Sequence, residues 1–348
     1  MSRRFEELKA EVIDPGFCVS CGACTGFCNR LKLNGIPKLV GECVEGCASP
    51  YGEDGACYEH CPMVKVLEAK HVFQRVKEDD LGNYRSLKAA RGMNKGMLKN
   101  PQDGGVATMI LKAAFESGKI DAAIVVGRDE EWRSQITLIR SAAELEGTEG
   151  SKYTETPVVH VLGEASRSGA KSVAVVAVSC QIQALRNLEY GLLYPNGFSP
   201  YSDMKIYAIG LFCSGIFQHN KLMKKLGVEP SSVSRMDVSG GTFNVDGEVS
   251  KGVPLKEVKD ALLPSCPLCL DYTSKLADIS LGSVGTSDGW TTVIERTPKG
   301  FGLLKNAIDQ GLVEATSEVD EEALRGTVTR RRHRIERNIK KSGENLPP

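Results

Sequence analysis

Residues 18–28 read Cys18-Val19-Ser20-Cys21-Gly22-Ala23-Cys24-Thr25-Gly26-Phe27-Cys28. Three cysteines follow one another at two-residue gaps, and the fourth comes after a gap of three. With this spacing three thiolates surround one [4Fe–4S] cube and the fourth ligates a second cube. The small residues Gly22 and Ala23 let backbone N–H groups approach the cluster sulfides. A structural zinc site is the alternative, although zinc more often uses paired Cys-x-x-Cys units. The stretch therefore predicts an iron–sulfur module.

The second half of this module, residues 43–61, is less regular. It ends in a cysteine, a three-residue gap and a Cys-Pro pair, as bacterial ferredoxins do. Its first gap is one residue too long, a loop over residues 48–56 is inserted, and Asn29 stands where proline is usual. By the ferredoxin pattern Cys61 completes the first cluster, and the second cluster is bound by Cys28, Cys43, Cys47 and Cys57. A zinc or vestigial site is the alternative here. The sequence thus predicts a two-[4Fe–4S] ferredoxin-like domain over residues 1–66, in which metal stabilises a fold too small for a core of its own.

Four further cysteines lie outside the module, and they bring the total to twelve, or three sets of four. Cys180 and Cys213 each end a predicted strand, and Cys266-Pro267-Leu268-Cys269 is a Cys-x-x-Cys unit. Sites in α/β sheets are built at the carboxyl ends of strands, so these four could converge on a third cluster. The alternative is that Cys180 and Cys213 are simple buried thiols, which are common in protein cores.

Composition and charge indicate which functional classes the protein is not expected to belong to. The 348 residues carry 44 basic and 44 acidic side chains, so no global charge favours nucleic-acid or membrane binding. Met1 is followed by polar residues, which predicts no signal peptide, and no run of 18 apolar residues predicts a membrane span. We expect a cytoplasmic protein. In that compartment clustered cysteines favour metal binding over disulfides.

The rest of the chain shows an alternation of helix and strand patterns. Residues 67–99 are expected to form a helix and linker, residues 100–312 an α/β domain, and residues 313–348 a polar helix and tail. Within the middle part, helices are expected over residues 104–117, 158–168 and 181–188, and buried strands over residues 121–127, 171–179 and 204–212. Short strands with glycine turns follow near residue 280. The predicted fold class is therefore α+β/α/β, with a layered α/β domain after the cysteine-rich module.

Two glycine-rich segments are candidates for cofactor binding. The first precedes a helix and consists of Gln102, Asp103, Gly104, Gly105, Val106, Ala107 and Thr108. Its backbone N–H groups and the helix dipole favour an anionic oxygen, although capping by Asp103 would explain the same residues. The second is Gly282-Ser283-Val284-Gly285-Thr286-Ser287-Asp288-Gly289-Trp290, either an ordinary turn or the lining of a planar cofactor with Trp290 as a wall. No G-x-G-x-x-G follows a strand, so a Rossmann site is not indicated. The arginine-rich residues 330–334 are most simply a solvated helix face, with partner docking as the sharper alternative.

Five segments, taken in order, resemble the coenzyme F420 hydrogenase/dehydrogenase beta-subunit family. They are Gln102-Asp103-Gly104-Gly105-Val106, Gly150-Ser151-Lys152-Tyr153, Cys180-Gln181-Ile182-Gln183-Ala184-Leu185, Gly210-Leu211-Phe212-Cys213, and residues 277–290 from Ala277-Asp278-Ile279-Ser280 to Gly289-Trp290. With the fused ferredoxin module, the chain looks most like the F420H2 dehydrogenase input subunit of methanogens. One departure is Ser179, which stands before Cys180 where relatives often have proline.

The resemblance implies one FAD, coenzyme F420 as the hydride carrier, and a third [4Fe–4S] cluster in the main domain. Carried over to this chain, the cluster ligands are Cys180, Cys213, Cys266 and Cys269, and the FAD contacts come from residues 102–108, Lys152, Tyr153 and the loop 282–290. The domain is then a mixed α/β, FAD-binding one that is not of the Rossmann type.

The resulting hypothesis is an F420-dependent oxidoreductase that passes electrons through FAD and three clusters to or from a partner redox protein or complex, which could be docked at a membrane. The region of residues 43–61 is the expected docking face. Two alternatives remain open: a ferredoxin-dependent reductase of an organic substrate, and an electron-transfer protein without flavin.

Overall fold

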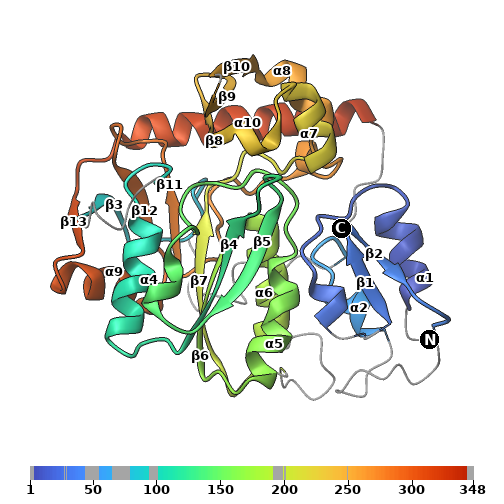
Figure 1. The fold of residues 1–348 in the computed structure, drawn as a ribbon, viewed down its shortest axis with the longest axis horizontal. Coiled ribbons are helices and arrows are strands. Elements are labelled where there is room, and N and C mark those ends of the chain that lie inside the picture. The colour runs from blue at the N-terminus through green and yellow to red at the C-terminus, as the bar shows by residue number, and fades with distance from the viewer. Residues whose placement is uncertain are drawn as a thin grey trace.

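The computed structural model describes residues 4–26, 28, 30–43, 55–64, 79–93, 101–190, 199, 201–248 and 250–342. A small N-terminal module lies beside a larger α/β body, and a long C-terminal helix runs along that body (Figure 1). Within the described part of the chain, no helix is both long and apolar enough to cross a membrane.

An eight-stranded mixed sheet forms the centre of the body, in the order β13-β3-β12-β11-β7-β6-β4-β5. Its four middle strands, β11, β7, β6 and β4, are parallel, and the outer pairs are antiparallel. The strands are β3 (Ser86–Gly92), β4 (Ala122–Arg128), β5 (Ser134–Ile139), β6 (Ser172–Val178), β7 (Lys205–Leu211), β11 (Ile279–Gly282), β12 (Thr291–Glu295) and β13 (Val313–Thr316).

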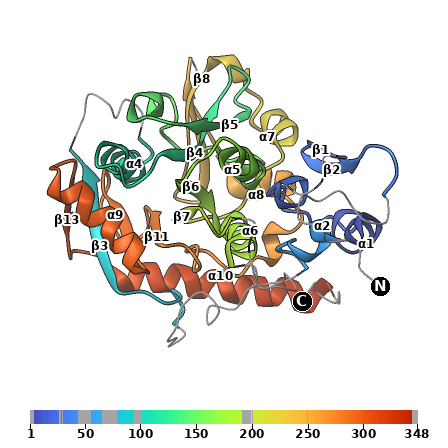
Figure 2. The same cartoon turned by 90° about the horizontal axis from the view of Figure 1, so that it is seen from below.

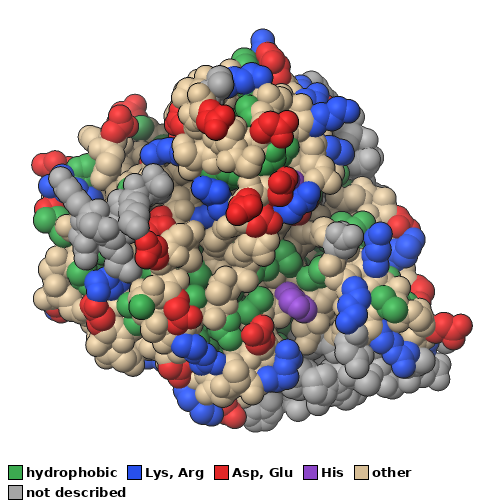
Figure 3. Space-filling model, viewed as in Figure 1, with side chains coloured by type: hydrophobic (Ala, Val, Ile, Leu, Met, Phe, Trp, Pro, Cys, Tyr) green, Lys and Arg blue, Asp and Glu red, His purple; other side chains and the backbone are tan. Residues whose placement is uncertain are grey.

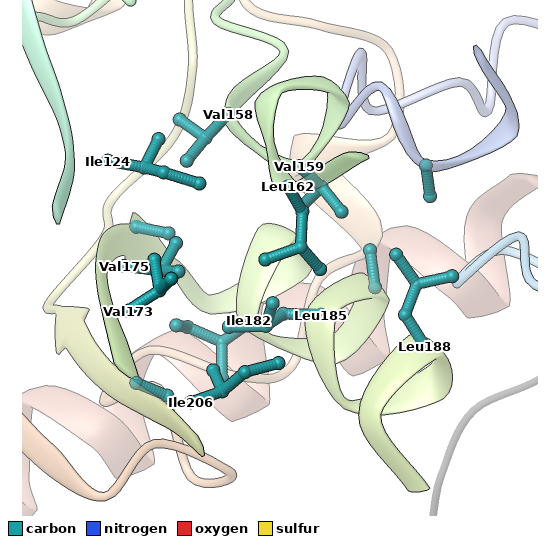
Figure 4. Close-up of a cluster of buried hydrophobic side chains, with 14 of the residues drawn as sticks. Ile124, Val158, Val159, Leu162, Val173, Val175, Ile182, Leu185, Leu188 and Ile206 are labelled. Atoms are coloured by element: carbon teal, nitrogen blue, oxygen red, sulfur yellow. The ribbon is translucent and has the colours of Figure 1, made fainter. Parts of the chain in front are cut away.

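Helices cover both faces of this sheet, as Figure 2 shows. One face packs against α4 (Val106–Glu116) and α9 (Pro298–Asp309). The other packs against α5 (Leu162–Arg167) and α6 (Ser179–Tyr190), where Ile182 and Leu185 of α6 meet Val173 and Val175 of β6 (Figure 4). The parallel strands are buried on both sides, which explains the nearly continuous apolar run of β6.

A second, three-stranded antiparallel sheet was not expected from the sequence. It consists of β8 (Val233–Ser239), β9 (Thr242–Gly247) and β10 (Lys251–Pro254). The helices α7 (His219–Leu226) and α8 (Leu255–Val258) pack beside it around the buried Phe243. This subdomain lies above the carboxyl end of the main sheet in Figure 1.

The N-terminal module is built from short elements around its cysteines. It contains α1 (Phe5–Leu8), a hairpin of β1 (Leu31–Asn34) and β2 (Ile36–Leu39), and α2 (Ala56–Glu59). Its apolar cluster includes Phe5, Leu8 and Leu31 together with six cysteines. Cysteine side chains thus occupy much of what would be a hydrophobic core in this small module.

The last element is α10 (Glu321–Ser342), which confirms the expected polar C-terminal helix. Its first half packs on the chain at residues 79–84, since Arg325 donates to both carboxylate oxygens of Asp79 at 2.6 and 3.0 Å. Its second half reaches the turn at residues 266–268, where the Asn338 side chain donates to Pro267 O at 3.3 Å. On the face drawn in Figure 3, positive and negative side chains are interspersed, in keeping with the zero net charge.

Most of the expected elements are found, with three differences in detail. Residues 158–168 divide into a 3-10 turn (Val158–Val161) followed by α5. Helix α6 begins at Ser179, so Cys180 lies in its first turn and not at the end of a strand. Residues 86–92 were expected in a helix and linker, and residues 313–316 in the tail. The two segments instead pair with each other as β3 and β13. The sequence did not indicate this pairing, because the two strands lie far apart along the chain.

Candidate functional site

The first thiol set lies at the 2-2-3 motif. Burial raises the pKa of Cys24 well above its usual value, and the nearby Cys21, Cys61 and Cys18 thiols raise it further. Cys61 is half-buried, and desolvation raises its pKa to about 12. Four thiols that disfavour one another's ionisation lie in one place, which requires a cationic centre if all four are to be thiolates. The grouping of Cys61 with Cys18, Cys21 and Cys24 is the one that the ferredoxin pattern predicts.

The second thiol set is described only in part. Cys28, Cys43 and Cys57 pack against the same apolar cluster as Phe5 and Leu8. Cys47, the fourth predicted ligand, lies outside the described residues. The pairing of Cys28 with these residues therefore stays a prediction.

The third thiol set brings together the cysteines that are scattered in the sequence. Burial raises the pKa of Cys180, and Cys269, Cys213 and Cys266 raise it further. Cys180 is the second residue of α6, which begins directly after β6, and Cys213 follows β7 by two residues, so both lie at the carboxyl edge of the parallel sheet.

Hydrogen bonds hold the segment of residues 266–274, which contains the Cys-x-x-Cys unit, against this edge. Cys213 N–H donates to Tyr272 O at 2.9 Å, and Ser274 Oγ donates to Leu211 O at 2.8 Å. The backbone N–H of Ile216 donates to Cys266 Sγ at 3.2 Å. An N–H donor to sulfur is the contact that stabilises a ligating thiolate.

The donor sets fit iron–sulfur clusters. All eleven described cysteines are free thiols. Among the described residues, no group of three or more His, Cys, Asp or Glu side chains is arranged to hold a single metal ion. A [4Fe–4S] cube does not need such an arrangement, because each thiolate binds a different iron at a different corner.

The first and third thiol sets face each other across the boundary between module and body. Cys21 is among the groups that raise the pKa of Cys180. The Cys21 carbonyl accepts a hydrogen bond from Val159 N–H at 3.0 Å, and Thr25 Oγ1 lies 2.8 Å from His160 Nδ1. Gly22 has a φ of +86°, and a Cβ there would lie 2.8 Å from the His160 Cβ. The module is thus seated directly on the 3-10 turn that precedes α5.

The first glycine-rich segment forms a connected polar site. The Gln102 amide donates to Asp237 Oδ1 at 2.5 Å and accepts from Ser151 N–H at 3.0 Å. Arg235 donates to the carbonyl of Gln102 at 3.1 Å. Burial, followed by the Asp237 charge, raises the pKa of Asp103 to about 6. Two segments that the sequence marked separately, residues 102–108 and 150–153, are therefore in contact.

The start of α4 fits an anionic ligand. The helix begins after Gly105, which has a φ of +69°, and no side chain caps it. The amides of Val106, Ala107 and Thr108 have no acceptor within the helix, so they can bind a phosphate oxygen. The capping role considered for Asp103 is not seen. Gly104 packs closely, since a Cβ would lie 2.8 Å from Ala90 O.

Lys152 and Tyr153 line the same region in different ways. The Lys152 ammonium donates to the carbonyls of Thr148, Glu149 and Gly150 at 2.6–3.0 Å, and burial lowers its pKa to about 8. The Lys152 side chain therefore stabilises the loop of residues 148–152 in which it lies. Tyr153 packs edge-on against Phe243 at 5.2 Å, and burial raises its pKa.

The second glycine-rich segment, the loop between β11 and β12, lies beside the first. Gly104 N–H donates to Thr291 Oγ1 at 3.1 Å, and the Asp288 charge reaches Asp103. Within the loop, Ser283 and Gly289 are exposed, whereas Val284 packs on the cluster around Tyr272. Gly282 leaves no room for a Cβ against Phe212, and Gly285 has a φ of +98°. The ring of Trp290 lies under Arg91, 4.7 Å from the guanidinium carbon.

Tyr272 lies between the glycine-rich segments and the third thiol set. Its ring is 5.4 Å from Phe212, and its pKa is raised to about 12 by burial, with Cys213 and Asp103 contributing. A single buried aromatic residue thus lies within electrostatic range of both candidate sites.

Sequence reasoning missed several residues that build this site. Arg331 is buried against the third thiol set, although its run was interpreted as a solvated or docking face. Arg186 of α6 and Asp278, just before β11, form a buried ion pair with a distance of 3.2 Å. For Arg331 the available signal was its helical spacing with Leu324, Val328 and Ile335, which puts it on the apolar side of the helix. Asp278 lies within the segment 277–280, which carried a resemblance but no role.

Comparison with known proteins agrees with this geometry. The family model for the N-terminal part of the coenzyme F420 hydrogenase/dehydrogenase beta chain matches residues 88–163, and the model for its C-terminal part matches residues 170–321. The F subunit of the F(420)H(2) dehydrogenase from Methanosarcina mazei is 34% identical and aligns over 84% of this chain and 82% of its own length.

Two further matches extend the comparison. The coenzyme F420-dependent sulfite reductase of Methanocaldococcus jannaschii is 35% identical over 86% of this chain, which spans only 47% of that longer protein. A chain of the F420-reducing [NiFe] hydrogenase complex from Methanosarcina barkeri superimposes with a TM-score of 0.70 at 33% identity, covering 77% of this chain and 95% of that one. The chain belongs to the coenzyme F420 hydrogenase/dehydrogenase beta-subunit family.

Proposed function

We propose that this protein transfers electrons between coenzyme F420 and a partner redox protein, using one FAD and three [4Fe–4S] clusters. The observation that carries the proposal is the convergence of Cys180, Cys213, Cys266 and Cys269 between the glycine-rich segments and the N-terminal cysteines. Such a series of sites is what a protein needs to accept a hydride at one end and release single electrons at the other.

When bound, a flavin converts a hydride into single electrons, and iron–sulfur clusters carry these one at a time. The chain's own residues supply position and environment. The first turn of α4 offers backbone N–H groups to an anionic phosphate. Gln102 fixes that segment against Asp237 and Ser151, and the loop 282–290 closes its other side.

The order of the thiol sets defines the path that the electrons would follow through the protein. Cys180 and Cys21 belong to neighbouring sets, and the contact of residues 21–25 with residues 159–160 fixes their separation. The N-terminal module lies at the far end of the series (Figure 1). We therefore place partner docking on this module, near residues 43–61. The hydrogenase complex that contains a similar chain supports an assembly of this kind.

The first test is an anaerobic spectrum and iron count of the purified protein. We expect about twelve irons per chain for three clusters, a flavin absorption band, and loss of reduced-F420 signal when an artificial acceptor is present. About eight irons and no flavin would indicate an electron-transfer protein without the family chemistry. No turnover of F420 together with activity on reduced ferredoxin would favour the alternative reductase.

Cys180→Ala tests the third thiol set specifically. We expect a loss of about four irons, while the flavin is retained and electron transfer to an external acceptor protein is lost. Ser283→Ala, an exposed change in the nearby loop, is the matched control and should keep the iron content. Unchanged iron and unchanged transfer in Cys180→Ala would show that no cluster is bound there.

A further inference from the structure

Arg331 lies on the inner face of α10, where it points at the third thiol set. Its side chain is only 7% exposed, whereas Arg330, the preceding residue, is exposed. The helix is fixed in this position by the Asn338 side chain, which donates to Pro267 O between the two cysteines of the Cys-x-x-Cys unit. Burial of a guanidinium at this point is therefore a property of how α10 packs.

The contacts of Arg331 are with the cysteine loops. Its Nη1 donates to Ser214 O at 2.9 Å, next to Cys213. Its charge lowers the pKa of Cys213, Cys266 and Cys269 against the dominant effect of burial. Its guanidinium carbon lies 5.8 Å from the ring of Tyr272.

What Arg331 lacks is a carboxylate partner. Two other arginines of α10 form ion pairs, Arg325 with Asp79 and Arg332 with Asp80, but within the described residues Arg331 has none. Its buried Nε also has no hydrogen-bond acceptor there. A buried cation is strongly unfavourable unless negative charge faces it. In this place the negative charge can come from thiolates, which a bound cluster keeps deprotonated.

We propose that Arg331 is a positioning residue that raises the reduction potential of the cluster held by Cys180, Cys213, Cys266 and Cys269. This inference rests on the proposed function, because it needs that cluster to be present. One-electron reduction adds one negative charge to the cluster and its thiolates. A fixed positive charge beside the ligand sulfurs stabilises that reduced form. Arg331 thereby favours electron entry into this cluster.

The test compares Arg331→Gln, Arg331→Lys and the control Arg330→Gln in the full-length holoprotein. Potentiometric titration followed by electron paramagnetic resonance measures the midpoint of each cluster. The signal that Cys180→Ala removes identifies the cluster in question. We expect Arg331→Gln to lower its reduction equilibrium constant at least tenfold, which is about 59 mV for one electron. Arg331→Lys should recover part of the shift because it keeps the charge, and Arg330→Gln should match wild type.

The outcomes are distinct. A wild-type protein without the Cys180-dependent signal would refute the proposed function itself. A wild-type signal with the same midpoint in Arg331→Gln and Arg330→Gln would refute only the role of Arg331. If Arg331→Gln loses the iron, Arg331→Lys decides: restored iron with a midpoint near wild type supports the charge effect. Loss of iron in both variants would mean that Arg331 serves assembly and not the potential.

Discussion

At the scale of single residues, Asp103 is the side chain whose ionisation the fold changes most clearly within the first glycine-rich segment. Its pKa rises to about 6 from an ordinary 3.8, because the carboxyl is partly buried and faces Asp237, and Arg235 offsets this only in part. The folded state thus holds the proton more tightly than the unfolded chain. The contribution of Asp103 to stability is therefore most favourable at low pH and decreases as the pH rises from about 4 to about 6, after which it is constant.

Asp103→Asn should remove this dependence. We expect the variant and the wild type to have similar thermal midpoints near pH 4, where both side chains are neutral, and the variant to be more stable above pH 6. Thermal unfolding at a series of pH values measures the difference. Asp203→Asn, at an exposed position, is the control and should follow the wild type. A constant offset at every pH would show that Asp103 does not titrate in this range.

At the scale of elements, one buried ion network ties α6 to the centre of the sheet. The fully buried Arg186 donates to Leu276 O at 2.8 Å, pairs with Asp278 and contacts Glu189. Asp278 in turn accepts from Ala208 N–H at 2.8 Å and from Thr297 Oγ1 at 2.6 Å. The network therefore fixes the helix that carries Cys180 relative to β7 and β11.

Arg186→Met should leave the Asp278 carboxylate buried without its cation. We expect a loss of about 3–5 kcal/mol in the free energy of unfolding, measured by urea denaturation of the metal-free and the loaded protein. Lys305→Met is the control, because Lys305 pairs with Asp309 on the surface with both side chains 57% exposed. It should cost less than about 1 kcal/mol. Equal effects of the two variants would contradict a structural role for the buried network.

At the scale of the whole molecule, the seating of the N-terminal module fixes the distance between its thiols and those of the body, on which the proposed electron transfer depends. Gly22 is the point of closest approach, with a left-handed φ and three atoms of Pro157 and His160 within 2.9 Å of a Cβ position. An alanine there is strained and also pushes the module off the body. Gly35, in the β1–β2 hairpin, has a φ of +75° but open space around it.

Gly22→Ala should therefore loosen the module, whereas Gly35→Ala should cost only the backbone strain, about 1–2 kcal/mol. Hydrogen exchange at residues 157–163 is the measurement, and we expect faster exchange in Gly22→Ala alone. Electron transfer from flavin to an acceptor protein should slow in the same variant, while flavin reduction does not. Exchange that is unchanged, or equally increased in both variants, would place the docking contact elsewhere.

The sequence alone determined the features that depend on neighbouring residues. The 2-2-3 spacing of Cys18, Cys21, Cys24 and Cys28 predicts a ligand loop because a few residues of backbone set the distances between those thiols. Strand β6 and helix α4 likewise follow from local patterns, namely an apolar run and the glycines before the helix. Both elements are therefore found within two residues of their expected bounds. The ferredoxin pattern also predicted the grouping of Cys61 with the first three thiols.

The tertiary structure decided everything that joins distant segments. It pairs β3 with β13, brings Gln102 against Ser151, and buries Arg331 against the third thiol set. The helical spacing of Leu324, Val328 and Ile335 marks the side of α10 that turns inward, and Arg331 falls on that side, unlike the exposed Arg330. Only the packing of α10 decides that this side meets the third thiol set. Contacts between distant residues depend on the relative placement of whole elements, and that placement is set by the shared core and not by the spacing of any motif.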